Sequence, residues 1–217
     1  MKLKDKVRYI ARKVLTPIYR SVLTKEHSAI YSEAISRLPK ELNFMLFYGN
    51  LLFHVRGDKQ PFIDDIDLML LDRSLDPNII NLFVQSGFHY NGYVATDSAL
   101  LALKFTYKEC PVDIHLCRRE DDWYFHEAVH FRNELAEKKG DANVKYYKRS
   151  YEIKFTIDSL ITITENLFYP NNASDILEII YGVDWQIPKS HNFNDYSNYT
   201  FLQNEVIVDM SKKLPQI

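Results

Sequence analysis

The chain has 217 residues, of which 46% are apolar and 26% are charged, and its formal net charge is −2. These values are typical of a folded globular protein, and the small net charge gives no indication of a nucleic-acid partner. Two cysteines exclude a disulfide-rich scaffold, and no apolar run approaches the roughly 20 residues that cross a bilayer. We therefore expect a cytoplasmic protein with one hydrophobic core.

Two helices are predicted before residue 40. Apolar residues recur at helical spacing over residues 3–22, where lysine and arginine are frequent, and Pro17 predicts a kink. A second helix is predicted over Glu26–Leu38. A basic amphipathic helix can lie on an anionic membrane, or it can be the solvated face of a packed helix. Peripheral contact of residues 3–22 with the inner face of a membrane therefore stays open.

Short strands and helices are predicted to alternate between residues 44 and 116. The Phe44–Tyr48 strand leads into a turn at Gly49-Asn50 and a short helix over Leu51–Arg56. The later elements are a strand over 65–71, a helix that opens at Asp76-Pro77 and closes at Gly87, and strands over 88–90, 101–107 and 112–116, with a turn around Asn91-Gly92.

The remainder of the chain gives fewer predictions. Residues 118–149 are polar and aromatic and support no assignment, whereas Asn172–Gly182 predicts a helix with a polar start, an apolar face and a terminal glycine. We interpret residues 1–217 as one α+β domain, a mixed sheet flanked by helices. Its parts are N-terminal helices in residues 1–40, a sheet core with the candidate site in residues 44–120 and a helical C-terminal part in residues 150–217.

Acidic residues stand at the start of a predicted buried strand, in the segment Asp64-Asp65-Ile66-Asp67. Alternate residues of a strand point to the same side, so Asp65 and Asp67 are expected side by side, with Asp64 on the other face. Two such carboxylates need a cation or protons to coexist, and their oxygens suit Mg²⁺ or Mn²⁺. Asp113 lies among apolar residues of another predicted strand. If these strands are neighbours, Asp65, Asp67 and Asp113 form a metal site and catalytic set for displacement at phosphorus.

A glycine-containing turn precedes these acids in the sequence. Gly49 allows close approach of the backbone to a ligand, and the amides of a following helix favour phosphate oxygens. His115 shares the face of Asp113, so it either contacts the substrate or fills the edge of the site. Lys59, Lys104 and Lys108 are interpreted as solvated lysines, and the less favoured alternative is that one of them binds phosphate.

Two separated segments resemble the LicD/fukutin family. The first runs from Gly49 to Arg56 and leads into the Asp65/Asp67 pair, where the family has Gly-Thr-Leu-Leu-Gly-x-x-Arg before an Asp-x-Asp strand. The second, Leu177–Pro188, is similar to the Leu-x-x-x-Tyr-Gly-x-x-Trp-x-x-Pro segment near the family's C-terminus. In the first segment, Asn50 and Phe53 depart from the usual Thr and Gly.

This resemblance implies a nucleotidyltransferase fold. It also implies transfer of a phospho-substituent, such as phosphocholine or a polyol phosphate, from a CDP-activated donor to a cell-surface glycan or its lipid-linked precursor. The residues it assigns are the metal ligands Asp65 and Asp67, the third acid Asp113, the donor-phosphate turn Gly49 and Asn50, and Arg56, which neutralises donor phosphates.

Other functions remain compatible with the same residues. A nucleotidyltransferase that adds NMP to a protein or a small molecule would use the same metal site, and it is the main alternative. A catalytically inactive binding module is also open. A sugar-nucleotide glycosyltransferase is disfavoured, because such folds usually place a full nucleotide-binding half before the Asp-x-Asp pair.

Overall fold

The computed structural model describes residues 28–57, 65–71, 78–129, 142–187 and 194–213. The larger of its two sheets contains β1 (Phe44–Leu46), β2 (Ile66–Leu70), β3 (His89–Ala95), β4 (Leu100–Tyr107), β5 (Cys110–His115), β8 (Val144–Tyr147), β10 (Leu160–Thr164), β11 (Leu167–Pro170) and β13 (Val206–Asp209). The smaller sheet contains β6 (Arg118–Glu120), β7 (Trp123–Val129), β9 (Ser150–Thr156) and β12 (Thr200–Leu202). The described helices are α2 (Tyr48–Arg56), α3 (Ile79–Gln85), α4 (Ala173–Tyr181), the 3₁₀ helix η1 (Tyr196–Asn198) and a helical stretch at 28–36.

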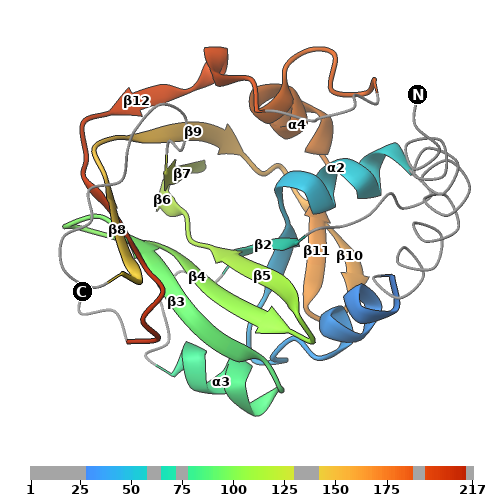
Figure 1. Ribbon diagram of the computed structural model, residues 1–217. Coiled ribbons are helices and arrows are strands. Elements are labelled where there is room, and N and C mark those ends of the chain that lie inside the picture. The colour runs from blue at the N-terminus through green and yellow to red at the C-terminus, as the bar shows by residue number, and fades with distance from the viewer. Residues whose placement is uncertain (1–27, 58–64, 72–77, 130–141, 188–193, 214–217) are drawn as a thin grey trace, which may run out of the picture.

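The larger sheet is mixed, with the strand order β10-β11-β1-β2-β5-β4-β3-β13-β8. The β1–β11 and β2–β5 pairs are parallel, and the other pairs are antiparallel. The smaller sheet is antiparallel throughout, in the order β12-β9-β7-β6. Figure 1 shows the larger sheet curving from β10 and β11 round to β8, with β9 of the smaller sheet across the top. The described residues thus form a mixed α+β structure, as the sequence predicts.

Apolar strands at the centre of the larger sheet explain where the core lies. All three residues of β1 are buried, and in β2 only Asp67 is partly exposed. Such near-continuous apolar runs are expected where a strand is covered on both faces. The α2 helix packs against β2 and α4 on one side, and α3 packs against β3. The Phe83 ring of α3 stacks on Phe105 at a centroid distance of 4.4 Å.

Several predicted elements are confirmed with shifted ends. The strands predicted from residues 44 and 65 are β1 and β2, and the predicted late helix is α4, which Asn172 and Gly182 flank. The predicted turn at Gly49-Asn50 is wrong, because both residues belong to the first turn of α2. Residue 48, a tyrosine with a positive φ of 40°, makes the sharp change from strand to helix instead.

The turn predicted around Asn91-Gly92 is also wrong. Both residues lie inside β3, where the pairing with β4 shifts register between Tyr90 and Gly92. A Cβ atom on Gly92 would lie 1.9 Å from the carbonyl oxygen of Asp209 in β13. The glycine is therefore required by the close approach of another strand, which the local sequence does not reveal.

The helical character predicted for residues 150–217 is wrong as well. The described part of that segment contributes five strands, β9 to β13, alongside α4 and η1. The predicted helix over 3–22, the acid Asp64 and the Asp76-Pro77 helix start lie outside the described residues. Within the described ranges, every helix is too short or too polar to cross a bilayer.

Candidate metal and phosphate site

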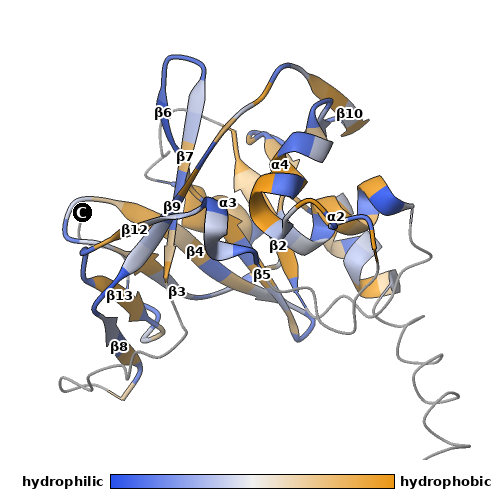
Figure 2. Cartoon of the chain, turned by 90° about the horizontal axis from the view of Figure 1, so that it is seen from above, coloured by the Kyte–Doolittle hydropathy of each residue, from blue (hydrophilic) through white to orange (hydrophobic). Residues whose placement is uncertain are grey.

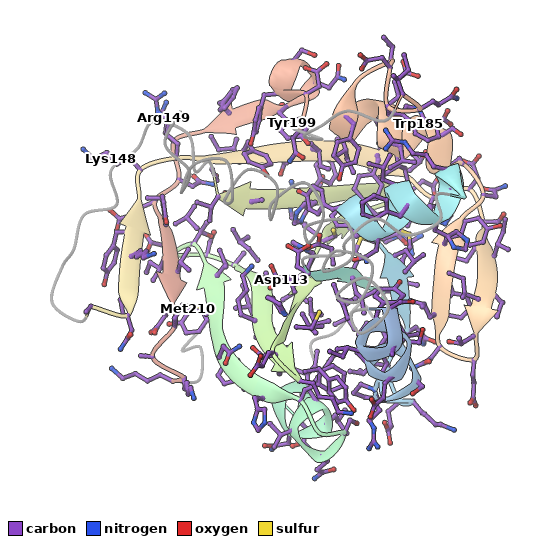
Figure 3. All side chains as sticks on the ribbon, turned by 45° about the vertical axis from the view of Figure 1, so that its right-hand side comes forward. Asp113, Lys148, Arg149, Trp185, Tyr199 and Met210 are labelled. Atoms are coloured by element: carbon purple, nitrogen blue, oxygen red, sulfur yellow. The ribbon has the colours of Figure 1, made fainter. Side chains whose placement is uncertain are left out.

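Three charged side chains form a row across neighbouring strands of the larger sheet. Asp67 of β2 lies opposite Asp113 of β5, and Asp113 lies opposite Lys104 of β4. Because cross-strand partners project to the same face, the two carboxylates and the ammonium group meet on one side of the sheet. Figure 3 places Asp113 near the centre of the molecule. The structure thus brings together the acids of two separate strands.

His115 completes a group of possible metal ligands. It follows Asp113 on the same face of β5, and its Nε2 atom lies 3.0 Å from Oδ1 of Asp67. One ligand atom from each of Asp67, Asp113 and His115 can be chosen so that all lie within 4.8 Å of one another. Carboxylate oxygens suit Mg²⁺ and Mn²⁺, and the added imidazole nitrogen favours Mn²⁺ of the two.

The site is electrostatically strained in the absence of a cation. Burial, followed by the charge of Asp113, raises the pKa of Asp67 to about 7, and the ammonium group of Lys104 opposes this rise. Burial lowers the pKa of His115 to about 4, so its imidazole is neutral at pH 7 and can offer a lone pair. A divalent cation would favour the ionised carboxylates, so the donor groups fit such an ion.

These groups face a cavity of about 500 Å³ between the two sheets. Lys104 and Asp113 line it from the larger sheet, Glu127 and Tyr151 from the smaller sheet, and Tyr181 from α4. A cavity of this size is in the range of small-molecule and cofactor sites. Figure 1 shows β9, α2 and α4 above β2 and β5 in that view.

The N-terminus of α2 contributes to the same cavity. Tyr48 and Gly49 line it, and the preceding Phe47 makes no side-chain capping bond. The first backbone bonds of this helix run from Asn50 and Leu51 to the carbonyl oxygen of Phe47. The N–H groups of Tyr48 and Gly49 therefore precede the hydrogen bonds of the helix, where amides and the helix dipole favour anionic oxygens. The position of Gly49 agrees with a phosphate-binding role.

Asn50 holds Asp67 in place. Its Oδ1 accepts a hydrogen bond from the backbone N–H of Asp67, and the backbone N–H of Phe47 donates to the Asp67 carbonyl oxygen at 3.1 Å. The Asn50 side chain is buried and does not line the cavity. Its position therefore indicates that it orients a candidate metal ligand, whereas the sequence predicts contact with the donor.

Arg56 lies away from the cavity lining. Its guanidinium group donates to the carbonyl oxygens of Trp185 and, at 3.2 Å, of Ile187. These bonds join the end of α2 to the chain after α4. Trp185 is buried beneath this link. The contacts of Arg56 indicate a structural role and give no support to donor binding.

Asp65 lies beside the site without joining its closest group. It precedes β2, is exposed, and lines the cavity together with Asp67. The group of ligand atoms within 4.8 Å contains His115 and not Asp65. The sequence predicts Asp65 as a ligand because of its spacing from Asp67, whereas the register of β5 gives that place to His115.

The sequence does not predict two residues of the cavity lining, Lys104 and His126, as site residues. The interpretation of Lys104 as solvated is wrong, because its side chain is 24% exposed and forms an ion pair with Asp113. A single charge within the apolar β4 strand was the available signal, the same one that identifies Asp113. His126 of β7 is buried with its ring centroid 5.0 Å from that of His115, and the unassigned region around it carries no comparable signal.

Taken together, the described groups suit a phosphorylated ligand held partly through a divalent cation. Carboxylates and an imidazole offer metal ligands, the start of α2 offers amides, and Lys104 offers a positive charge. No family model matches the sequence, and no curated protein matches it.

Proposed function

We propose that the protein is a metal-dependent phosphotransferase with a nucleotidyltransferase-type core, similar to the LicD/fukutin family. The observation that carries this proposal is the placement of Asp67 and Asp113 opposite each other on parallel strands, with His115 beside them. In-line transfer at phosphorus needs concentrated positive charge near the reacting oxygens, and paired acids of this kind recruit it as a divalent ion. Mg²⁺ or Mn²⁺ is the proposed cofactor.

Asp67, Asp113 and His115 would hold the cation, which when bound neutralises charge on the donor diphosphate and on the leaving group. We assign the phosphate oxygens of the donor to the N–H groups of Tyr48 and Gly49, because these two residues line the same cavity at the start of α2. Asn50 fixes the backbone of Asp67 and so keeps its carboxylate at the site. In this proposal the groups promote transfer by positioning the donor and by stabilising its charge.

The acceptor hydroxyl requires a group that takes its proton. Asp65 is exposed and lines the cavity, so its carboxylate is accessible to an acceptor that enters from solvent. Asp113 forms an ion pair with Lys104, which fixes its carboxylate in place, so we assign it as a metal ligand and not as the base. Tyr151 and Tyr181 line the cavity with aromatic surface and reduce access of water to the donor.

The substrates follow from the resemblance. The donor is a CDP-activated alcohol of the phosphocholine or polyol phosphate type, and the acceptor is a cell-surface glycan or its lipid-linked precursor. A lipid-linked acceptor also suits peripheral membrane contact through residues 3–22, which lie outside the described ranges. Liposome binding that survives deletion of those residues would remove the membrane part of this proposal.

The test combines two isosteric variants with a donor screen. Purified wild-type protein, Asp67→Asn and Asp113→Asn are incubated with Mn²⁺, CDP-choline, CDP-ribitol or CDP-glycerol and a glycan acceptor. We expect release of CMP by the wild type and a loss of about 100-fold or more in both variants, with circular dichroism spectra unchanged. Near-normal activity of either folded variant would refute the assignment.

Product mass separates this function from the main alternative. A phosphotransferase adds the mass of a phospho-alcohol to its acceptor and releases CMP. A nucleotidyltransferase adds the mass of a nucleotide to a protein or small molecule and releases pyrophosphate. Both reactions require the same two carboxylates, so the variants test the site and the products test the reaction.

A further inference from the structure

Lys104 stands at the end of the row of charges, on the other side of Asp113 from Asp67. The row runs Asp67, Asp113, Lys104 across β2, β5 and β4, and Asp113 pairs directly with both neighbours. The Lys104 ammonium group is ion-paired with Oδ2 of Asp113. Oδ2 of Asp113 is therefore already paired with the ammonium group of Lys104.

The metal-ligand atoms that the site offers beside this ion pair are enough for one divalent ion. Two-metal phosphoryl-transfer sites hold their ions about 3.5–4 Å apart, and they need enough carboxylate oxygens to contact both. Here Asp67, Asp113 and His115 offer one atom each within a single group. An octahedral ion bound by three protein atoms keeps three positions for phosphate oxygens and water. Within the described ranges, no second set of three or more such ligand atoms lies within 4.8 Å of one another.

The charges of the site also favour one bound divalent ion. Asp67 and Asp113 supply two negative charges when ionised, and Lys104 returns one positive charge. One divalent ion therefore already exceeds the net negative charge of these three side chains. A second ion would face Lys104 across a partly buried site, where repulsion is weakly screened.

We propose that Lys104 takes the place of a second divalent cation, so that the site binds one ion per chain. This inference rests on the proposed function only for the presence of a metal site. In it, the ammonium group neutralises Asp113 and presents a fixed positive charge to the donor phosphates beside the bound ion. Lys104 thereby limits the number of bound ions to one, and it supplies the positive charge on the side of Asp113 that faces away from Asp67.

The test counts bound ions without measuring activity. Wild-type protein and Lys104→Met are titrated with Mn²⁺, and the electron paramagnetic resonance signal of free Mn²⁺ gives the number bound. We expect one ion per chain for the wild type and two for Lys104→Met, whose side chain is similar in size but uncharged. Lys104→Arg keeps the charge and should bind one ion. Lys108→Met removes a lysine that is ion-paired with Glu33 outside the cavity lining, and it should also bind one.

The outcomes separate this inference from the proposed function. Two ions in the wild type, or one in a folded Lys104→Met protein, would overturn the role of Lys104 while leaving a metal site in place. No bound ion in the wild type would overturn both proposals. If Lys104→Met fails to fold, Lys104→Gln replaces it, and the wild-type and Lys104→Arg counts still decide, since two ions in either contradicts the inference.

Discussion

The Asp67 carboxyl group is buried beside Asp113, and this environment determines how the site responds to pH. Burial and the neighbouring charge raise the pKa of Asp67 to about 7. The folded, metal-free protein therefore keeps a proton on Asp67 between about pH 4 and pH 7, where the unfolded chain has lost it. The contribution of this group to the free energy of unfolding accordingly falls as pH rises through that interval.

Metal affinity should change in the opposite direction. A divalent ion competes with the proton on Asp67, so we expect Mn²⁺ affinity to rise by up to about tenfold per pH unit below pH 7 and to level off above it. His115, with a pKa of about 4, adds no slope in this range. Calorimetric titrations at about pH 6, 7 and 8 measure the effect. Equal affinities at the lowest and highest pH would contradict the burial of an ionisable ligand.

His115 and Asp65 compete for the third place at the metal, and single substitutions distinguish them. The ligand-atom group contains His115, whereas Asp65 is exposed beside it. We expect His115→Ala to weaken Mn²⁺ binding by at least about tenfold, and Asp65→Asn to weaken it less. The same calorimetric titration compares both variants. A larger loss for Asp65→Asn would restore the ligand set that the sequence alone predicts.

The sequence identifies the acids of the site better than their partners. Asp67 and Asp113 are recognisable because a carboxylate is unusual within an apolar strand. His115 is placed on the correct face by the alternation of a strand, but only the register with β2 brings its ring to Asp67. The ion pair of Lys104 likewise depends on pairing between β4 and β5. Register is a long-range property that one sequence does not specify.

At the scale of elements, the junction of β1 and α2 fixes the position of β2. Phe47 and Asn50 bond to the backbone carbonyl and N–H of Asp67, so the helix start and the acidic strand are joined through main-chain groups. A buried backbone N–H without a partner costs about as much as a lost hydrogen bond.

Removing the Asn50 side chain should therefore weaken both fold and site. We expect Asn50→Ala to lower the free energy of unfolding by about 1–3 kcal/mol, because the Asp67 N–H loses its partner, and to weaken Mn²⁺ binding. Urea unfolding followed by circular dichroism measures the first effect. Asn81→Ala, on an exposed face of α3, is the matched control and should change stability by less than about 0.5 kcal/mol. Equal stabilities of the two variants would contradict the junction.

Local patterns predict the elements that lie on either side of this junction. The apolar runs of β1 and β2 and the capped helix α4 are visible from composition and periodicity. Strand β7 is not, because its two buried residues, His126 and Val129, are three positions apart, and so its burial lacks the alternation of a half-buried strand. Gly92 gives a wrong turn prediction, because a side chain is absent there to allow the close approach of β13 and not to form a turn.

At the scale of the whole molecule, late segments of the chain complete a sheet that begins early. Strand β11 pairs in parallel with β1, and β13 is inserted between β3 and β8. Sequence neighbours usually pair first, so these distant insertions are not predictable from local pattern. The segment from residue 150 onward, for which the sequence predicts helices, supplies strands to both sheets.

One end of the larger sheet is an exposed apolar edge. Strand β10 has β11 as its described neighbour, and Leu160, Ile161 and Ile163 are 41%, 40% and 36% exposed. Figure 2 shows the apolar colour of β10 at the margin of the molecule. Exposed apolar edge strands promote association between chains.

A charge on this edge should reduce self-association without harming the fold. We expect Ile161→Lys to change the free energy of unfolding by less than about 1 kcal/mol, because the side chain is largely exposed. Light scattering across a concentration series should show less association than for the wild type. A cooperative loss of stability in this variant would mean that Ile161 is covered within the folded chain.

We propose that the carboxylates of two strands, those of Asp67 and Asp113, meet around one divalent cation. Crystals grown with Mn²⁺ and measured at the manganese absorption edge test it directly, because anomalous density locates the ion independently of any activity. We expect one peak per chain, in contact with Asp67, Asp113 and His115. A peak elsewhere, or none in crystals where these side chains are well ordered, would contradict it.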